Sequence, residues 1–167
     1  MKKGKGVKKG QDMALDVNYD LSFMFDTNIF NRILDRQIDI ASFNKECSYF
    51  ATRIQYDEVC ATPNPERRAM LIGLFKDVST IPTSSAVVGI SRVGECKIPD
   101  DDLYQKLLAE LDRLGYKQNN KQDGLIGDTV IKNGFTLVSE DCNLREAVKK
   151  FGGKVKLLDE FLHEVQT

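Results

Sequence analysis

Residues 21–28 read LSFMFDTN, an almost wholly apolar run that ends at a carboxylate and two small polar residues. A strand that is covered on both faces shows continuous hydrophobicity rather than alternation, so this run predicts a buried central strand. Asp26 follows the strand directly, at the end where open α/β sheets bind their ligands. The alternative interpretation of Asp26 is a cap for a helix predicted over residues 27–36.

Apolar runs of strand length alternate with helical patterns along the rest of the chain. Further strands are predicted over residues 47–51, 78–81, 135–138 and 155–158. Further helices are predicted over residues 53–60, from Pro65 onward, and over residues 103–114, 123–131, 142–151 and 159–165. This alternation predicts a parallel sheet with helices on both faces, which is an α/β fold. Residues 83–99 show no clear period and predict a long loop or lid.

The composition indicates one globular domain. The 167 residues are 41% hydrophobic and 29% charged, and the formal net charge is -1. We therefore expect a tail over residues 1–18 and a single domain over residues 19–167. The chain is not globally basic, so a nucleic acid would have to meet a local patch. No apolar stretch is long enough to span a bilayer and none resembles a signal peptide, which predicts a cytoplasmic protein without a membrane partner.

The N-terminal ten residues are predicted to form a flexible basic tail, because five lysines and three glycines bury nothing. Two interpretations stay open: a non-specific contact with RNA phosphates, or a solvated terminus. The lysines of this candidate RNA-binding tail are Lys2, Lys3, Lys5, Lys8 and Lys9.

Cysteine and histidine usage argues against a zinc site. The four cysteines contain no CxxC pair, and the only histidine is His163, near the C-terminus. Free thiols in a reducing compartment are the simplest interpretation.

Four carboxylates stand out by their placement. Asp26 and Asp141 each follow an apolar strand, Glu58 lies in a helix just after a strand, and Asp123 opens a helix just before one. A parallel sheet brings such positions to one edge. Clustered carboxylates repel each other, and a divalent cation neutralises them directly. Ligands with oxygen only suit Mg²⁺ or Mn²⁺. The alternative is that these acids are helix caps and surface groups.

Four short pieces of the sequence resemble the PIN-domain family of metal-dependent ribonucleases, in the order and relative spacing of that family's acidic motifs. The pieces are residues 25–28 (FDTN), 52–58 (TRIQYDE), 123–129 (DGLIGDT) and 137–141 (LVSED). The resemblance covers roughly residues 20–160, and the motifs are distinctive only together.

The resemblance implies a three-layer α/β/α fold with a short parallel sheet and an acidic pocket at its carboxyl end. Carried over residue by residue, the metal-binding and catalytic carboxylates are Asp26, Glu58, Asp123 and Asp141, with Asn28 and Ser139 as supporting polar residues. The cofactor would be Mg²⁺ or Mn²⁺. Asp57 is the alternative to Glu58. We prefer Glu58 because Gln55 lies one helical turn from Glu58 on the same face.

The sequence also departs from the family pattern. Asp128 stands where the family usually has a small residue, and a helix points it about 140° away from Asp123. We expect Asp128 to meet solvent or Lys132 rather than a metal. Gly124 and Gly127, inside the same predicted helix, indicate close approach of a neighbouring element. Residues 83–120 do not match the family cleanly.

The favoured hypothesis is a divalent-metal-dependent endoribonuclease, as the toxin of a toxin–antitoxin pair with an antitoxin protein as partner. The alternative from another class is a catalytically inactive PIN-fold module that binds RNA or protein. An aspartyl phosphatase fits poorly, because it needs an acid two residues after the first Asp, where this chain has Asn28. Both a monomer and a homodimer stay open.

Overall fold

A five-stranded parallel sheet forms the centre of the molecule. The computed structural model describes residues 21–87, 89–91 and 101–166. The strands lie in the order β3-β2-β1-β4-β5, and every neighbouring pair is parallel. Their bounds are β1 Ser22–Phe25, β2 Ser48–Thr52, β3 Ser79–Ile81, β4 Thr136–Val138 and β5 Lys154–Lys156.

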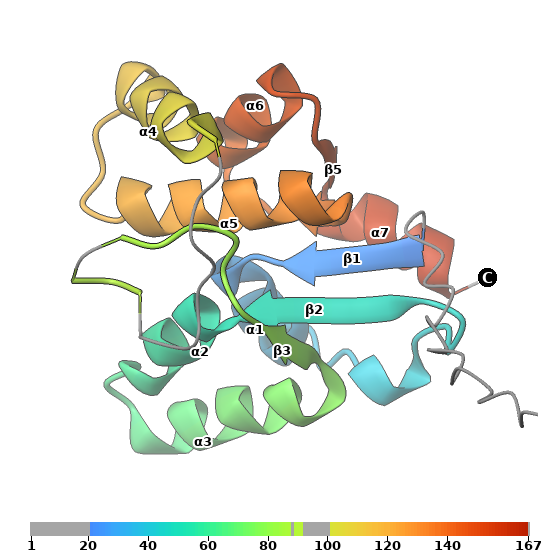
Figure 1. Ribbon diagram of the computed structural model, residues 1–167. Coiled ribbons are helices and arrows are strands. Elements are labelled where there is room, and N and C mark those ends of the chain that lie inside the picture. Colours follow the sequence, from blue (N-terminus) through green and yellow to red (C-terminus); the bar gives the residue numbers. More distant parts are fainter. Residues whose placement is uncertain (1–20, 88, 92–100, 167) are drawn as a thin grey trace, which may run out of the picture.

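Helices cover both faces of this sheet (Figure 1). Their bounds are α1 Thr27–Asp35, α2 Arg53–Cys60, α3 Pro65–Leu74, α4 Leu103–Leu114, α5 Asn120–Asn133, α6 Cys142–Lys150 and α7 Leu158–Val165. Two 3₁₀ turns, η2 Ile40–Ser42 and η3 Phe75–Asp77, lie in the connections. The predicted three-layer α/β/α fold is therefore confirmed.

The central strand divides the core into two apolar clusters. Phe23 and Phe25 of β1 pack with α1, α3 and α7 on one face, and Met24 packs with α4, α5 and α6 on the other. All four residues of β1 are buried. This two-sided burial is the physical reason for the continuous apolar run, and it confirms the predicted central strand.

The register aligns the carboxyl ends of β1 and β4. Phe25 pairs with Val138, and the Asp26 N–H donates to the Val138 carbonyl at 3.0 Å. Asp26 and Ser139 therefore leave the sheet side by side. Every strand predicted from the sequence is present, with ends that differ by one or two residues.

One helix boundary predicted from the sequence is wrong. A helix was predicted over residues 123–131, but α5 begins at Asn120, so Asp123 lies in the first turn rather than at the start. The side chain of Asn120 is buried and donates to Asp112 at 2.8 Å and to the Gly115 carbonyl at 3.1 Å. These contacts with the end of α4 fix the first turn of α5.

Two glycines of α5 lie against neighbouring helices, as predicted. A Cβ added at Gly124 would lie 3.1 Å from the Tyr104 ring of α4, and one added at Gly127 would lie 3.1 Å from Val148 of α6. Both glycines therefore allow α5 to pack closely against α4 and α6.

Several predictions concern residues outside the part of the chain that the structure describes. The tail over residues 1–18, with Lys2, Lys3, Lys5, Lys8 and Lys9, lies outside the described residues. So do residues 88 and 92–99 of the predicted loop. Among the helices that the structure describes, none has both the length and the apolar character needed to cross a membrane.

Candidate functional site

Asp26 lies at the carboxyl end of β1 and is 5% exposed. It caps α1, because its Oδ1 accepts the Thr27 N–H at 2.7 Å. Its Oδ2 accepts from Ser139 Oγ at 2.7 Å and from Asn28 Nδ2 at 2.5 Å. Burial and the charge of Asp141 raise the pKa of Asp26, although these three hydrogen bonds oppose the rise. The cap and the site residue predicted from the sequence are thus the same side chain.

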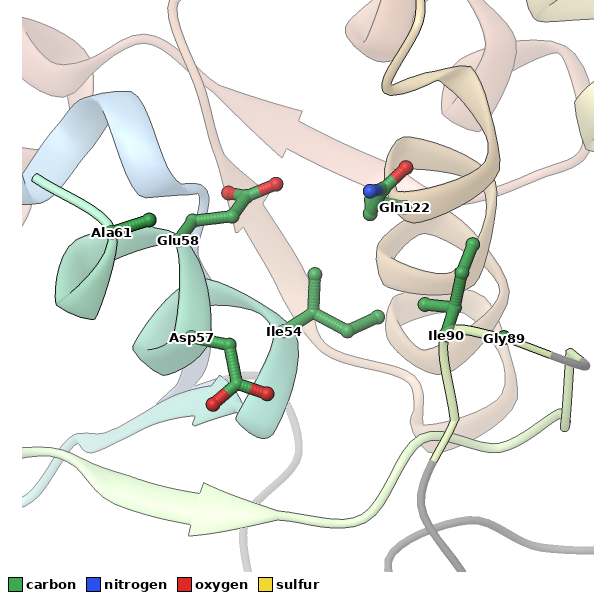
Figure 2. Close-up of a pocket in the computed structure, with 7 residues that line it drawn as sticks. All are labelled: Ile54, Asp57, Glu58, Ala61, Gly89, Ile90 and Gln122. Carbon is green, nitrogen blue, oxygen red and sulfur yellow. The ribbon is translucent and has the colours of Figure 1, made fainter.

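Glu58 projects from α2 toward this position. Its carboxylate accepts a hydrogen bond from the Thr27 hydroxyl. Burial raises the pKa of Glu58, and so does the charge of Asp26, while the Thr27 hydrogen bond lowers it. The preferred residue of the pair Asp57 and Glu58 is therefore the one beside Asp26. Asp57 pairs instead with Arg53 at 3.1 Å, and Figure 2 shows the two carboxylates pointing in different directions.

The start of α2 is tied to the end of β1. Gln55 and Thr52 form a capping box, and Gln55 Nε2 donates to the Phe25 carbonyl at 3.0 Å. Gln55 is fully buried. It positions the helix that carries Glu58, which is a more indirect role than the shared helical face expected from the sequence.

Asp123 is the carboxylate whose pKa responds most clearly to the other three acids. It is 6% exposed in the first turn of α5. Burial, followed by the charges of Asp26, Asp141 and Glu58, raises the pKa of Asp123 from 3.8 to about 8, while Lys117 opposes the rise. The four carboxylates predicted from the sequence therefore lie close enough to repel one another.

Asp141 completes the cluster and carries the opposite shift. It caps α6 through the Leu144 N–H at 3.0 Å, and its Oδ2 pairs with the Lys117 ammonium. Burial raises the pKa of Asp141, but the Lys117 ion pair and the Leu144 N–H together hold it below its usual value.

The two supporting residues predicted from the sequence bridge the segments that carry the acids. Ser139 Oγ donates to Asp26 and accepts the Asp141 N–H at 3.0 Å. Asn28 donates to Asp26, and its Oδ1 accepts the Glu140 N–H at 3.3 Å. They fix the end of β1 against the end of β4.

Two residues of the site were missed. Thr27 holds Glu58, and Lys117, from the connection between α4 and α5, holds Asp141. The only signal in the sequence was the position of Thr27 beside Asp26 and of a lysine shortly before Asp123.

Asp128 differs in part from expectation. The predicted contact with Lys132 is present, as an ion pair at 2.9 Å. The predicted contact with solvent is not, because the Asp128 side chain is fully buried. The reason is that α5 is covered on several sides, by the sheet and by α4 and α6.

The donor set fits a hard divalent cation, because all four acids offer oxygen only. Within the described part of the chain, no three His, Cys, Asp or Glu side chains converge closely enough to form a ready-made metal site. Instead Lys117 offsets Asp141, and the pKa of Asp123 is raised until it favours the neutral form near pH 7. The raised pKa of Asp123 and the Lys117 ammonium thus both reduce the net negative charge of the cluster.

Comparisons with known proteins find relatives by structure only. No protein-family model and no curated protein matches the chain. A structure of the PIN domain endonuclease Utp24 is 12% identical over 85% of this chain and 88% of that one, with a TM-score of 0.54. VapBC-1 from nontypeable Haemophilus influenzae is 16% identical over 81% and 96%, with a TM-score of 0.53. At these identities the likeness concerns the fold.

Proposed function

We propose that this chain, whose fold is that of the PIN-domain proteins, is a divalent-metal-dependent endoribonuclease. The observation that carries the proposal is the cluster formed by Asp26 and Asp141, at the ends of β1 and β4, with Glu58 of α2 and Asp123 of α5. Their mutual repulsion helps to raise the pKa of Asp123 to about 8. Such repulsion lowers stability, so it favours a role in which a cation is bound. The likeness of the fold to a PIN-domain endonuclease supports the same class of activity.

Asp26, Glu58, Asp123 and Asp141 would hold Mg²⁺ or Mn²⁺. When bound there, the cation would activate water and stabilise the charge that develops on the phosphodiester oxygens. To reach it, Asp141 would have to release Lys117.

The remaining residues of the site orient these ligands. Ser139 and Asn28 hold both the Asp26 carboxylate and the segment that leads to Asp141. Thr27 holds Glu58. Hydrogen bonds of this kind fix the direction of a metal-binding carboxylate, and their loss typically costs about 10- to 100-fold in metal affinity or activity.

A catalytically inactive PIN-fold module that binds RNA or protein is the second candidate. One observation favours it: among the described residues, no three of the acids lie in an arrangement that could hold a metal ion, and the Lys117 ammonium already pairs with Asp141. An active nuclease needs this pair to open, whereas a binding module does not.

The toxin role and its antitoxin partner form a finer proposal. The fold likeness to VapBC-1 supports it. Co-expression with the product of a small neighbouring gene tests it. A stable complex that suppresses RNA cleavage is expected, and a neighbour that neither binds nor inhibits would count against a toxin.

The experiment that separates the two main candidates is cleavage of an RNA panel by the purified protein. We expect cleavage with Mg²⁺ or Mn²⁺ and none with EDTA, and the cleavage should return when the metal is restored. RNA binding without cleavage under any metal condition would support the inactive module instead.

A further inference from the structure

The connection between α4 and α5 brings two hydrogen-bond donors to the acid cluster. The Lys117 ammonium pairs with Asp141, and Asn119 Nδ2 donates to Asp123 Oδ1 at 3.4 Å. These two acids belong to different elements, since Asp141 caps α6 and Asp123 lies in the first turn of α5. One short segment of the chain, residues 115–119, therefore contacts two of the four carboxylates.

The backbone of this connection is held by the start of α5. The N–H of Asn120 donates to the Lys117 carbonyl at 3.2 Å, and the N–H of Asp123 donates to the Asn119 carbonyl at 3.0 Å. The buried side chain of Asn120 also donates to the Gly115 carbonyl at 3.1 Å. These bonds fix the positions from which Lys117 and Asn119 reach the acids.

Lys117 faces both the acids and the solvent. Its side chain is 41% exposed, whereas Asp123 is 6% exposed. The hydrogen bond to Asp141 raises the pKa of Lys117, and the charges of Asp141 and Asp123 add to the rise, while burial opposes it. Lys117 is thus a charged ammonium group at the rim of the cluster, on a side that a polyanion in solution can reach.

Both donors need a new acceptor once the acids hold a divalent cation. Asp141 and Asp123 then direct their oxygens to the metal, and the positive charge of the metal repels the ammonium of Lys117. An ammonium group and an amide N–H can only donate, so Lys117 and Asn119 are left facing the cluster without acceptors. A phosphate group supplies acceptor oxygens together with negative charge, and lysine commonly binds phosphate.

We propose that Lys117, assisted by Asn119, binds an RNA phosphate beside the acid cluster, and that it does so when Asp141 turns from Lys117 to a metal ion. The proposal rests on the proposed ribonuclease function for the identity of the metal and of the nucleic acid. Lys117 then has two alternative partners, Asp141 in the metal-free protein and a phosphate in the metal-bound protein. Metal and RNA therefore increase each other's affinity, and this coupling depends on Lys117.

The test is the affinity for a short single-stranded RNA at several salt concentrations, in Ca²⁺ and in EDTA. Ca²⁺ takes oxygen ligands, and stopped-flow fluorescence reads binding before any cleavage. With Ca²⁺, Lys117→Met should weaken RNA binding roughly tenfold, the usual effect of losing a hydrogen bond to a charged group. It should also reduce the dependence of log affinity on log salt by about 0.7, which corresponds to one phosphate contact. In EDTA both changes should be absent, because Asp141 already pairs with Lys117.

Two further variants separate a phosphate contact from other roles of Lys117. Lys117→Arg keeps the positive charge, so it should keep the salt dependence of the wild type in Ca²⁺. Lys149→Met is the matched control, because it removes an exposed positive charge from the last turn of α6, the helix that Asp141 caps at its start. It should behave as the wild type in both conditions. Without RNA, Lys117→Met should bind Ca²⁺ more tightly than the wild type in calorimetry, since no ammonium competes for Asp141.

Equal losses of RNA affinity in Ca²⁺ and in EDTA would overturn the proposal, because Lys117 would then act only as a surface charge. Unchanged affinity in both conditions would overturn it as well. RNA binding requires no cleavage, so this proposal can fail while metal-dependent cleavage stands. Conversely, a metal-dependent contribution of Lys117 to RNA binding in a protein that never cleaves RNA would retire the nuclease proposal alone.

Discussion

Ser139 is the smallest side chain on which the geometry of the acid cluster depends. Its hydroxyl donates to Asp26 and accepts the backbone N–H of Asp141, so it links two of the four acids. Residues that orient metal ligands in this way typically contribute 10- to 100-fold to affinity or activity.

We therefore predict that Ser139→Ala lowers metal-dependent RNA cleavage by roughly 10- to 100-fold. The fold should persist, because the change removes one atom and leaves the strand pairing of β4 in place. Single-turnover cleavage rates measure the loss, and circular dichroism checks the fold. Ser79→Ala, at an exposed position of β3, is the matched control. An unchanged rate in Ser139→Ala would mean that the orientation of Asp26 does not depend on this contact.

Asp123 predicts how the stability of the metal-free protein depends on pH. Its pKa is 3.8 ordinarily and about 8 in the folded protein, so folding takes up a proton between these values. The stability that this proton contributes is fully present below about pH 4 and is lost as the pH rises through about 8. Asp26 and Glu58 shift in the same direction, whereas Asp141 shifts in the opposite direction.

Thermal melts in EDTA between pH 5 and pH 9 measure this dependence, over a range chosen to span the titration. The melting temperature of the wild type should fall with rising pH, and Asp123→Asn should flatten the fall. A wild-type profile that rises over this range would show that Asp123 is ionised throughout.

At the scale of elements, α2 is the part of the fold that sets the position of Glu58. Its first turn is hydrogen-bonded to the end of β1 through the buried side chain of Gln55, which contacts both Thr52 and the Phe25 carbonyl. Replacing Gln55 would leave that carbonyl and the start of the helix without their partner.

Gln55→Ala is expected to lower the free energy of unfolding by about 1–3 kcal/mol, the usual effect of leaving a buried polar group unpaired. Cleavage should fall as well, because Glu58 moves with the helix. Urea unfolding and single-turnover cleavage measure the two effects. Gln105→Ala on the exposed side of α4 serves as the control. Stability equal to that of the wild type would contradict the role given to Gln55.

The strands and most helices could be predicted from the sequence because each carries a local signal. The run from Phe23 to Phe25 is apolar without interruption since β1 is buried on both faces. Asn64 and Pro65 mark the start of α3 through a cap and a first-turn proline. The start of α5 had no such signal, because it depends on the contacts of Asn120 with the end of α4.

From the sequence, the site could be predicted only where the strand order determines which residues lie together. A parallel sheet brings Asp26 and Asp141 to one edge, so their nearness follows from the strand order. The ion pair between Lys117 and Asp141 joins residues from separate parts of the fold, so the spacing of apolar and polar residues in the sequence does not indicate it. The burial of Asp128 likewise follows from how α5 packs, which a sequence pattern does not specify.

At the scale of the whole molecule, repulsion among the clustered carboxylates lowers the stability of the metal-free protein, and a bound cation should reduce this repulsion. A cation that binds only the folded state raises the melting temperature. At a hundredfold excess over Kd, we expect Mg²⁺ or Mn²⁺ to raise it by about 5–10 °C for a chain of this size.

Lys117→Met should enlarge this effect. The variant removes the ammonium that pairs with Asp141, so the metal-free protein should melt at a lower temperature and gain more from the cation. Lys121→Met, at an exposed position of α5, should behave as the wild type. Melts with Mg²⁺, Mn²⁺ or Na⁺ at equal ionic strength make the comparison. A shift no larger with the divalent ions than with Na⁺ would argue that the carboxylates hold no metal.

The most direct measurement is single-turnover RNA cleavage by Asp26→Asn in the presence of Mg²⁺ or Mn²⁺. Asp26 lies at the end of the central strand and receives three hydrogen bonds. Asparagine keeps the size of this side chain and removes its charge. Asp77→Asn, at an exposed position in η3, is the matched control, since the buried Asp128 is unsuitable. We predict that Asp26→Asn folds and binds RNA but does not cleave it, while Asp77→Asn cleaves at the wild-type rate. Full cleavage by Asp26→Asn would contradict the assignment of the acid cluster as the catalytic site.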